Sequence, residues 1–239
     1  MCNLGMSLQG TYRRVRRGIE RLGGKSVVVT AVIPVLNEEK TLSDVLSVVT
    51  SCRRIHKVVV IDDGSTDNSR AIIKKFPVKA VCLNKRRGKG EAVRKGTRGI
   101  TQGIILFLDG DLVGLNHHHI ASLLDPLLYD NVTMSIGLRD KDNVVADAIM
   151  PYFPLIGGER AIWAEVFSEI SKVPLIDGWG LESVMNNYCR KKGLKIAKVR
   201  LPGVDHIGGQ TMKYDFVAFL KEVYEVVLTR IKLFSVKYD

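Results

Sequence analysis

Four apolar runs rich in β-branched residues constrain the fold of this chain more than any other feature. They lie at residues 26–34, 57–61, 78–84 and 103–112. The segments between them have helical character, and the first of these repeats apolar side chains on one face, at Leu42, Val45, Leu46 and Val49. Asn37 is the N-cap expected for that helix. Strands that alternate with helices in this way predict an α/β fold with a buried, mostly parallel sheet.

The alternation becomes less regular after Asp111. A helix is expected at 119–128, a strand at 131–139, helices at 159–171 and 180–193, and a strand at 194–202. Gly193 suits the end of the 180–193 helix. These elements predict a single domain at 26–212, preceded by a basic extension at 1–25 and followed by an amphipathic helix at 213–239.

The net charge of +11 is concentrated in two segments. Residues 1–25 carry six Lys/Arg and one Glu, and residues 85–98 carry seven Lys/Arg and one Glu. The net charge of the rest of the chain is zero. Such patches can face phosphates, nucleic acid or an anionic membrane. Within 11–25, apolar and arginine positions alternate as in an interfacial helix, so peripheral membrane contact is expected there. The alternative is docking on the same domain or in a homodimer.

The location of the protein is expected to be cytoplasmic, with peripheral attachment to the inner face of the membrane. The four cysteines are scattered and form no CxxC pair, which favours free thiols in a reducing compartment. No apolar run of about 18 residues predicts a transmembrane helix, and the first residues lack the apolar core of a secretory signal.

Polar side chains follow three of the predicted strands. They are Pro34 to Glu38, Asp62 with Asp63, and Asp109 with Asp111. Because ligands of parallel α/β sheets bind beyond the carboxyl ends of the strands, these groups are expected to converge. Two carboxylates one residue apart can hold a hard divalent cation that also takes substrate phosphates as ligands. The alternative for Asp109 and Asp111 is a surface turn.

The other two motifs are less specific by themselves. Ser65 and Asp67 are expected to cap the next helix, while Asp62 and Asp63 can accept hydrogen bonds from a base or a ribose. In the segment 84–96, glycines allow close backbone approach and the start of a helix favours anions. That loop matches no Walker A motif, and a solvated basic loop is the alternative.

Taken in order, "VIPVLNEEKTL", "VVVIDDGSTDNS", "GKGEAVRKG" and "ILFLDGDL" resemble the motif series of family-two-type glycosyltransferases with the GT-A fold. The resemblance covers roughly residues 26–206 and implies a Rossmann-like, mostly parallel sheet flanked by helices. It also implies that nucleotide binding falls to Pro34, Glu38 and Asp63, with Lys89 near the donor. Asp109 and Asp111 would hold Mg²⁺ or Mn²⁺ on the diphosphate of a sugar nucleotide.

The second half of the chain resembles the glucosyl-3-phosphoglycerate synthase group in "DGWGLESVMNNY" and "LPGVDHIGG". This implies His206 as a third metal ligand, with Asp205 as the alternative, and Glu182 near the reacting sugar. The alternatives are that Glu182 only favours the positive end of its own helix and that His206 is a loop residue. Arg160 could grip an acceptor phosphate or form a structural ion pair. The chain length is nearer to that of dolichol-phosphate mannose synthase-like enzymes.

These resemblances imply a hexosyltransferase that uses a UDP-sugar, or alternatively a GDP-sugar, and a phosphate-bearing acceptor such as 3-phosphoglycerate or a polyprenyl phosphate. Glu182 and Asp111 are the expected catalytic residues, and Glu182 is the candidate base if the sugar inverts; retention and inversion both stay open. A sugar nucleotidyltransferase would need a glycine-rich loop after the first strand, which "PVLNEEKTL" lacks. A non-enzymatic membrane or nucleic-acid binder is the other alternative. No nucleic-acid partner is expected, since the acidic turns would repel phosphates.

Overall fold

The computed structural model of the chain describes residues 27–139, 158–173 and 180–207. The basic extension predicted at 1–25 and the amphipathic helix predicted at 213–239 lie outside these ranges. The expected membrane contact, homodimer and domain boundaries therefore stay predictions. Within the described ranges, no helix has both the length and the apolar character needed to cross a membrane.

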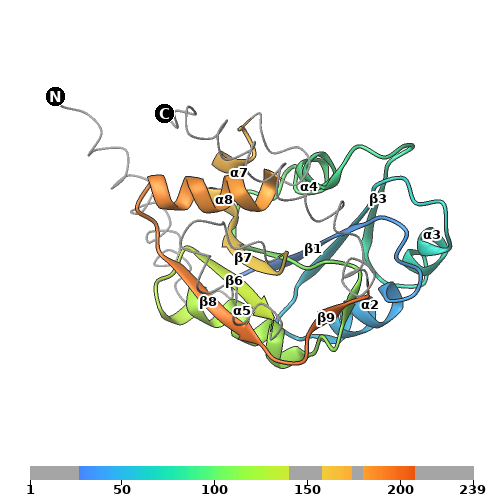
Figure 1. Cartoon of the computed structure of the whole chain (residues 1–239), viewed down its shortest axis with the longest axis horizontal. Coiled ribbons are helices and arrows are strands. Elements are labelled where there is room, and N and C mark those ends of the chain that lie inside the picture. Colours follow the sequence, from blue (N-terminus) through green and yellow to red (C-terminus); the bar gives the residue numbers. More distant parts are fainter. Residues whose placement is uncertain (1–26, 140–157, 174–179, 208–239) are drawn as a thin grey trace, which may run out of the picture.

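A seven-stranded sheet forms the centre of the molecule (Figure 1). Its spatial order is β3-β2-β1-β4-β7-β6-β8. The strands, in chain order, are β1 (Val29–Val35), β2 (Lys57–Asp62), β3 (Lys79–Cys82), β4 (Ile104–Phe107), β6 (Met134–Arg139), β7 (Arg160–Trp163) and β8 (Ile196–Leu201). A second sheet pairs β5 (Leu112–Val113) with β9 (Asp205–His206).

The direction of the strands brings distant segments to one edge of the large sheet. β1 pairs in parallel with β2 and β4, β2 with β3, and β6 with β8, whereas β7 is antiparallel to both of its neighbours. The carboxyl ends of the parallel strands thus share an edge with the start of β7. The α/β class and the mostly parallel sheet predicted from the sequence are confirmed.

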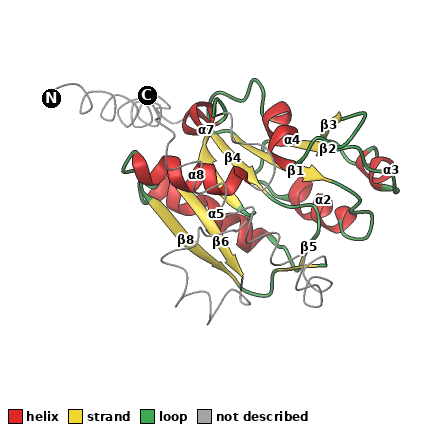
Figure 2. Cartoon of the chain, turned by 45° about the horizontal axis from the view of Figure 1, so that its top comes forward, coloured by secondary structure: helices red, strands yellow, loops and turns green. Residues whose placement is uncertain are grey.

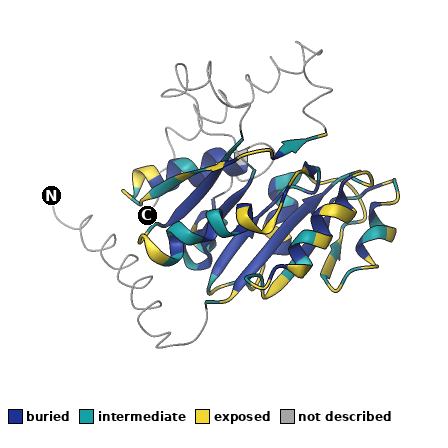
Figure 3. Ribbon diagram, turned by 90° about the horizontal axis from the view of Figure 1, so that it is seen from below, coloured by how far each residue is buried: buried dark blue, intermediate teal, exposed yellow. Residues whose placement is uncertain are grey.

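Helices cover both faces of the sheet (Figures 1 and 2). α4 (Lys89–Gly96), α7 (Ala164–Ile170) and α8 (Gly180–Lys191) lie on one face, whereas α2 (Leu42–Ser51) and α5 (His117–Tyr129) lie on the other. The short α3 (Ser69–Ile73) packs beside α2. Figure 3 shows the strands as the buried layer between the two sets of helices.

The sheet interior has the apolar composition expected of strands covered on both faces. Every residue of β1 and of β4 is buried. Burying a Val, Ile or Leu side chain stabilises a fold by roughly 1.5–3 kcal/mol, so these strands carry much of the stability that fixes the edge. Gly96 allows α4 to approach closely, because a Cβ there would lie 2.2 Å from Cγ1 of Ile61.

The prediction that Asn37 caps the following helix is wrong. α2 begins only at Leu42, after Thr41. Asn37 instead adopts a positive φ of 57°, and its Oδ1 accepts a hydrogen bond of 2.8 Å from the amide of Thr66. Its short polar side chain tolerates that left-handed conformation, so the residue serves a turn rather than a helix start.

The helix predicted at 159–171 is half strand. Arg160–Trp163 form β7, which fills the gap between β4 and β6, and only Ala164–Ile170 are helical. A short apolar segment fits either structure by its periodicity alone. Here the backbone groups of β4 and β6 that face the gap need hydrogen-bond partners, so the segment forms a strand between them.

Candidate functional site

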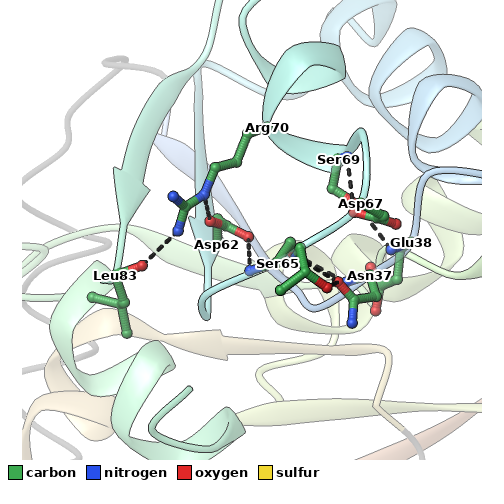
Figure 4. Close-up of polar contacts among 9 residues, drawn as sticks. Asn37, Glu38, Asp62, Ser65, Asp67, Ser69, Arg70 and Leu83 are labelled. Atoms are coloured by element: carbon green, nitrogen blue, oxygen red, sulfur yellow. Dashed lines mark hydrogen bonds and ion pairs between the residues drawn. The ribbon is translucent and has the colours of Figure 1, made fainter. Parts of the chain in front are cut away.

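The loop after β1 and the loop after β2 are joined by side-chain to backbone hydrogen bonds (Figure 4). The amide of Asn37 donates to Oγ of Ser65 at 3.0 Å, and the amide of Glu38 donates to Oγ of Ser69 at 2.9 Å. Asp67 accepts from the amide of Ser69 at 2.9 Å, near the start of α3. These bonds fix Glu38 at the carboxyl edge of the sheet, next to Pro34, which is buried within β1.

The first acidic pair is satisfied from within the protein. Asp62 is fully buried, pairs with Nε of Arg70 and accepts from the amide of Ser65 at 3.0 Å (Figure 4). Asp63 accepts from the backbone amides of Arg87 at 2.7 Å and Gly88 at 2.8 Å. Asp63 therefore holds the basic loop that leads into α4.

Lys89, the first residue of α4, connects this loop to the second acidic pair. Its Nζ lies 2.8 Å from Oδ1 of Asp109 and 2.9 Å from Oε1 of Glu182, at the start of α8. Burial lowers the pKa of Lys89, but the two carboxylates more than offset this, so its net shift is upward. For Asp109 burial acts in the opposite direction and raises the pKa, but the charge of Lys89 and its hydrogen bond lower the pKa below the ordinary value. The structure thus joins three residues that the sequence places 20 or more positions apart.

The small sheet positions Asp111 and His206. Leu112 in β5 faces His206 in β9, so the two chain segments run side by side. Nδ1 of His206 lies 2.5 Å from Oδ1 of Asp111, and its Nε2 lies 3.1 Å from Oε1 of Glu159. Although burial lowers the pKa of His206, these hydrogen bonds raise it to about 9. Asp205 is the alternative to His206 as the third metal ligand, and its Oδ1 accepts a hydrogen bond of 3.0 Å from the backbone amide of His206.

Glu159 is a component of the site that sequence reasoning missed. It is fully buried and immediately precedes β7, the strand whose start lies at the same edge as the acidic turns. No motif surrounds it in the sequence, and its segment was expected to be helical. The available signal was a charged pair, Glu159 and Arg160, in an otherwise apolar stretch.

Arg160 is fully buried in β7, and its Nη1 donates to Oδ1 of Asn186 at 2.7 Å. Burial lowers the pKa of Arg160, while Glu182 and Glu159 oppose that shift. The structural ion pair that the sequence left open as the alternative stays a prediction. The acceptor-binding role of Arg160 stays a prediction.

Glu38 contributes a further acidic group that is kept neutral. Burial, together with the charges of Asp111 and Asp109, raises the pKa of Glu38 to about 9. Its Oε2 is buried without a hydrogen-bond partner among the described residues, and a Cβ on Gly110 would lie only 1.9 Å from that oxygen. The glycine between the two aspartates therefore leaves the space that this oxygen of Glu38 occupies.

The acidic groups gathered here suit a divalent cation. One ligand atom each from Asp109, Glu159 and His206 lie within 4.8 Å of one another. Buried carboxylate oxygens of Glu159 and Glu182 have no hydrogen-bond partner in the described part of the chain. Carboxylate oxygens with one imidazole nitrogen form a donor set that fits Mn²⁺ or Mg²⁺.

Comparison with solved structures shows the fold. Glucosyl-3-phosphoglycerate synthase from Mycobacterium tuberculosis, solved with Mn²⁺, UDP and glucosyl-3-phosphoglycerate, superposes with a TM-score of 0.72 at 22% identity, covering 93% of this chain and 85% of that one. The same enzyme with Mn²⁺ and UDP-glucose gives a TM-score of 0.73 at 21% identity, covering 93% and 84%. The GT-A-like arrangement implied by the sequence motifs is confirmed.

Sequence comparison identifies the family. Glycosyltransferase AglJ from Haloferax volcanii is 30% identical over 190 residues, which cover 72% of this chain and 61% of that protein. An undecaprenyl-phosphate 4-deoxy-4-formamido-L-arabinose transferase from Edwardsiella ictaluri is 35% identical over 94 residues, 35% of this chain and 29% of that protein. The match thus spans less than two thirds of either relative. Residues 30–171, more than half of the sequence, match the profile of glycosyl transferase family 2, so the chain belongs to that family.

Proposed function

We propose that this protein is a divalent-cation-dependent glycosyltransferase that moves a sugar from a nucleotide-diphosphate donor, by preference a UDP-sugar, to a phosphate-bearing acceptor. The observation that carries the proposal is the cluster of carboxylates that the fold gathers around Lys89 and His206 at the carboxyl edge of the sheet. Family membership and the GT-A-like fold support it.

Asp109, Asp111 and His206 are the residues proposed to hold Mg²⁺ or Mn²⁺. When bound, the ion supplies Lewis-acid stabilisation to the diphosphate that departs from the sugar. Pro34, Glu38 and Asp63 are proposed to line the nucleotide. Asp63 would act partly through the backbone of the 87–88 loop, to which it is already bonded.

Lys89 and Glu182 are proposed to act on the reacting sugar and its leaving group. Lys89 is held between two carboxylates, so its ammonium group is positioned before any donor arrives. A fixed positive charge near a developing anion needs little reorganisation and lowers the barrier. Glu182 is 5% exposed and lies beside that ammonium, where it can face the sugar as base or as electrostatic partner.

The acceptor is proposed to carry a phosphate, either on a small acid or on a polyprenyl chain. The structural neighbour is solved with phosphoglyceric acid, and the E. ictaluri relative is named for undecaprenyl phosphate. These two point to different carriers of the same phosphate chemistry. The choice between them is open to direct assay.

The test is a thermal-shift screen of the purified protein with UDP-sugars and GDP-sugars, with and without Mn²⁺ or Mg²⁺. A true donor should raise the melting temperature by mass action only when the metal is present. The donor is then offered with 3-phosphoglycerate or with polyprenyl phosphate in vesicles, and labelled product is measured. Release of pyrophosphate would indicate a nucleotidyltransferase instead, and salt-sensitive retention of nucleic acid without sugar binding would indicate a basic binding protein.

A further inference from the structure

Glu159 is a buried carboxylate to which the proposed function above assigns no role. Its side chain is 0% exposed, and one oxygen, Oε1, lies 3.1 Å from Nε2 of His206. The other, Oε2, is buried and without a hydrogen-bond partner among the described residues. Burying an ionised carboxylate with one oxygen unsatisfied is costly, so its contact with His206 is expected to serve a purpose.

The chain is built to bring Glu159 to this place. β7 runs antiparallel to β4, with Phe107 opposite Arg160, so the residue before β7 meets the residues that follow β4. Gly158 makes the approach closer still, because a Cβ there would lie 2.1 Å from Oδ2 of Asp109. The amide of Gly137 in β6 donates to the carbonyl of Glu159 at 2.8 Å, which fixes its backbone on the other side.

His206 has two ring nitrogens, and each one faces a carboxylate. Nδ1 faces Asp111, which is 28% exposed, whereas Nε2 faces the fully buried Glu159. A histidine that binds a metal ion through one nitrogen carries its proton on the other nitrogen. A carboxylate that accepts a hydrogen bond from this N–H fixes both the tautomer and the ring orientation. Of the two carboxylates, Glu159 is the one shielded from solvent.

We propose that Glu159 is a positioning residue for the metal ligand His206, an inference that rests on the proposed function. Glu159 would accept a hydrogen bond from Nε2–H, which would leave the lone pair of Nδ1 available to a cation held together with Asp111. Glu159 thus preorganises a ligand that comes from a segment 47 positions further along the chain. The competing arrangement, in which Glu159 itself binds the cation together with Asp109, is the alternative that the experiment must separate.

The experiment measures Mn²⁺ affinity by electron paramagnetic resonance for the wild type, Glu159→Leu and Glu159→Gln. Loss of an outer-shell carboxylate costs roughly 10–100-fold in metal affinity, so Glu159→Leu should bind Mn²⁺ that much more weakly. The amide oxygen of glutamine can still accept a hydrogen bond from Nε2–H, so Glu159→Gln should stay within about threefold of the wild type. Glu165→Leu is the matched control, because Glu165 also has a buried oxygen without a hydrogen-bond partner in the described part of the chain. Glu165 lies at the opposite edge of the sheet, next to Ala164, whose amide donates to the carbonyl of Gly103.

A second readout follows the histidine itself. Nitrogen-15 NMR of the Mg²⁺-loaded protein should show His206 with the proton on Nε2 in the wild type and in Glu159→Gln, and a mixture of tautomers in Glu159→Leu. Urea unfolding in EDTA shows whether each variant is folded. If Glu159→Leu does not fold, the Glu159→Gln affinity and tautomer decide by themselves.

The outcomes separate the inference from the function on which it rests. A wild type that binds no Mn²⁺ would remove the proposed function. A wild type that binds, with Glu159→Leu binding equally well, would overturn the positioning role alone. A loss of more than 100-fold in Glu159→Gln would also overturn it, because only a direct ligand needs the charged oxygen.

Discussion

The two acidic turns of this molecule look alike in sequence and differ in structure. Each follows a buried parallel strand, and each places two aspartates at the same edge of the sheet. The carboxylates of Asp62 and Asp63 accept hydrogen bonds from an arginine and three backbone amides. Asp109 and Asp111 meet Lys89 and His206 amid further carboxylates.

The different partners of the two turns indicate which turn would be stabilised by a bound cation. The first turn is complete within the protein and holds two loops in place, so an added cation would find little uncompensated charge there. The second turn gathers further acidic groups around it, and buried oxygens of Glu38, Glu159 and Glu182 have no hydrogen-bond partner among the described residues. Structural and ligand-binding uses of the same motif can therefore be told apart by their partners.

Asp111→Ala tests most directly whether the second turn binds the cation, and it should have the largest effect. We expect sugar transfer to fall by on the order of 10³-fold, because the charge that develops on the leaving diphosphate loses its cation. The fold should survive, since Asp111 lies on the exposed side of the cluster. Calorimetry with UDP, with and without Mn²⁺, checks this, and metal-dependent binding equal to the wild type would count against the assignment.

Glu182→Gln should have the next largest effect. We expect a fall in kcat on the order of 10²-fold with little change in Mn²⁺ or UDP affinity, because the amide keeps the contact with Lys89 but cannot act as a base or carry charge. Steady-state kinetics with saturating donor gives the measurement. A change in donor affinity with kcat intact would instead make Glu182 a donor-binding residue.

Asp62→Asn tests the turn that is complete in itself. We expect the free energy of unfolding to drop by about 2 kcal/mol, because the variant loses a charge-assisted hydrogen bond from the partly exposed Arg70. Urea denaturation measures this loss, and Mn²⁺ affinity should stay unchanged. Loss of Mn²⁺ binding in a folded Asp62→Asn protein would erase the distinction between the two turns.

The last prediction concerns Glu38 and pH. The pKa of this residue is raised in the fold from 4.5 to about 9, so the folded protein binds a proton that the unfolded chain releases. In the metal-free protein, this bound proton contributes to the free energy of unfolding. The contribution is fully present below pH 4.5 and is lost as pH rises through about 9. Glu38→Gln should flatten this dependence. Urea unfolding in EDTA between pH 5 and 9 measures it, and equal slopes for the two proteins would refute the buried, neutral glutamic acid.

Much of the fold could be read from the sequence, because its signals are local. The strands at 29–35, 57–62 and 104–107 follow from apolar runs, and their polar ends follow from the rule that ligands meet the carboxyl edge of a parallel sheet. Where local signals were ambiguous, the prediction was wrong. Arg160–Trp163 became a strand because two neighbouring strands needed a partner, and Asn37 became a turn residue because Thr66 needed an acceptor.

By itself the sequence determined the α/β class, the family motifs and the acidic turns, since periodicity and short motifs are properties of neighbouring residues. Only the tertiary structure decided which carboxylates are satisfied. The contacts of His206 with Asp111 and Glu159 span 95 and 47 positions, and that of Lys89 with Glu182 joins two helices on one face of the sheet. Such pairings depend on strand order and direction, which no local pattern encodes, and they set the charge balance on which the proposed chemistry depends.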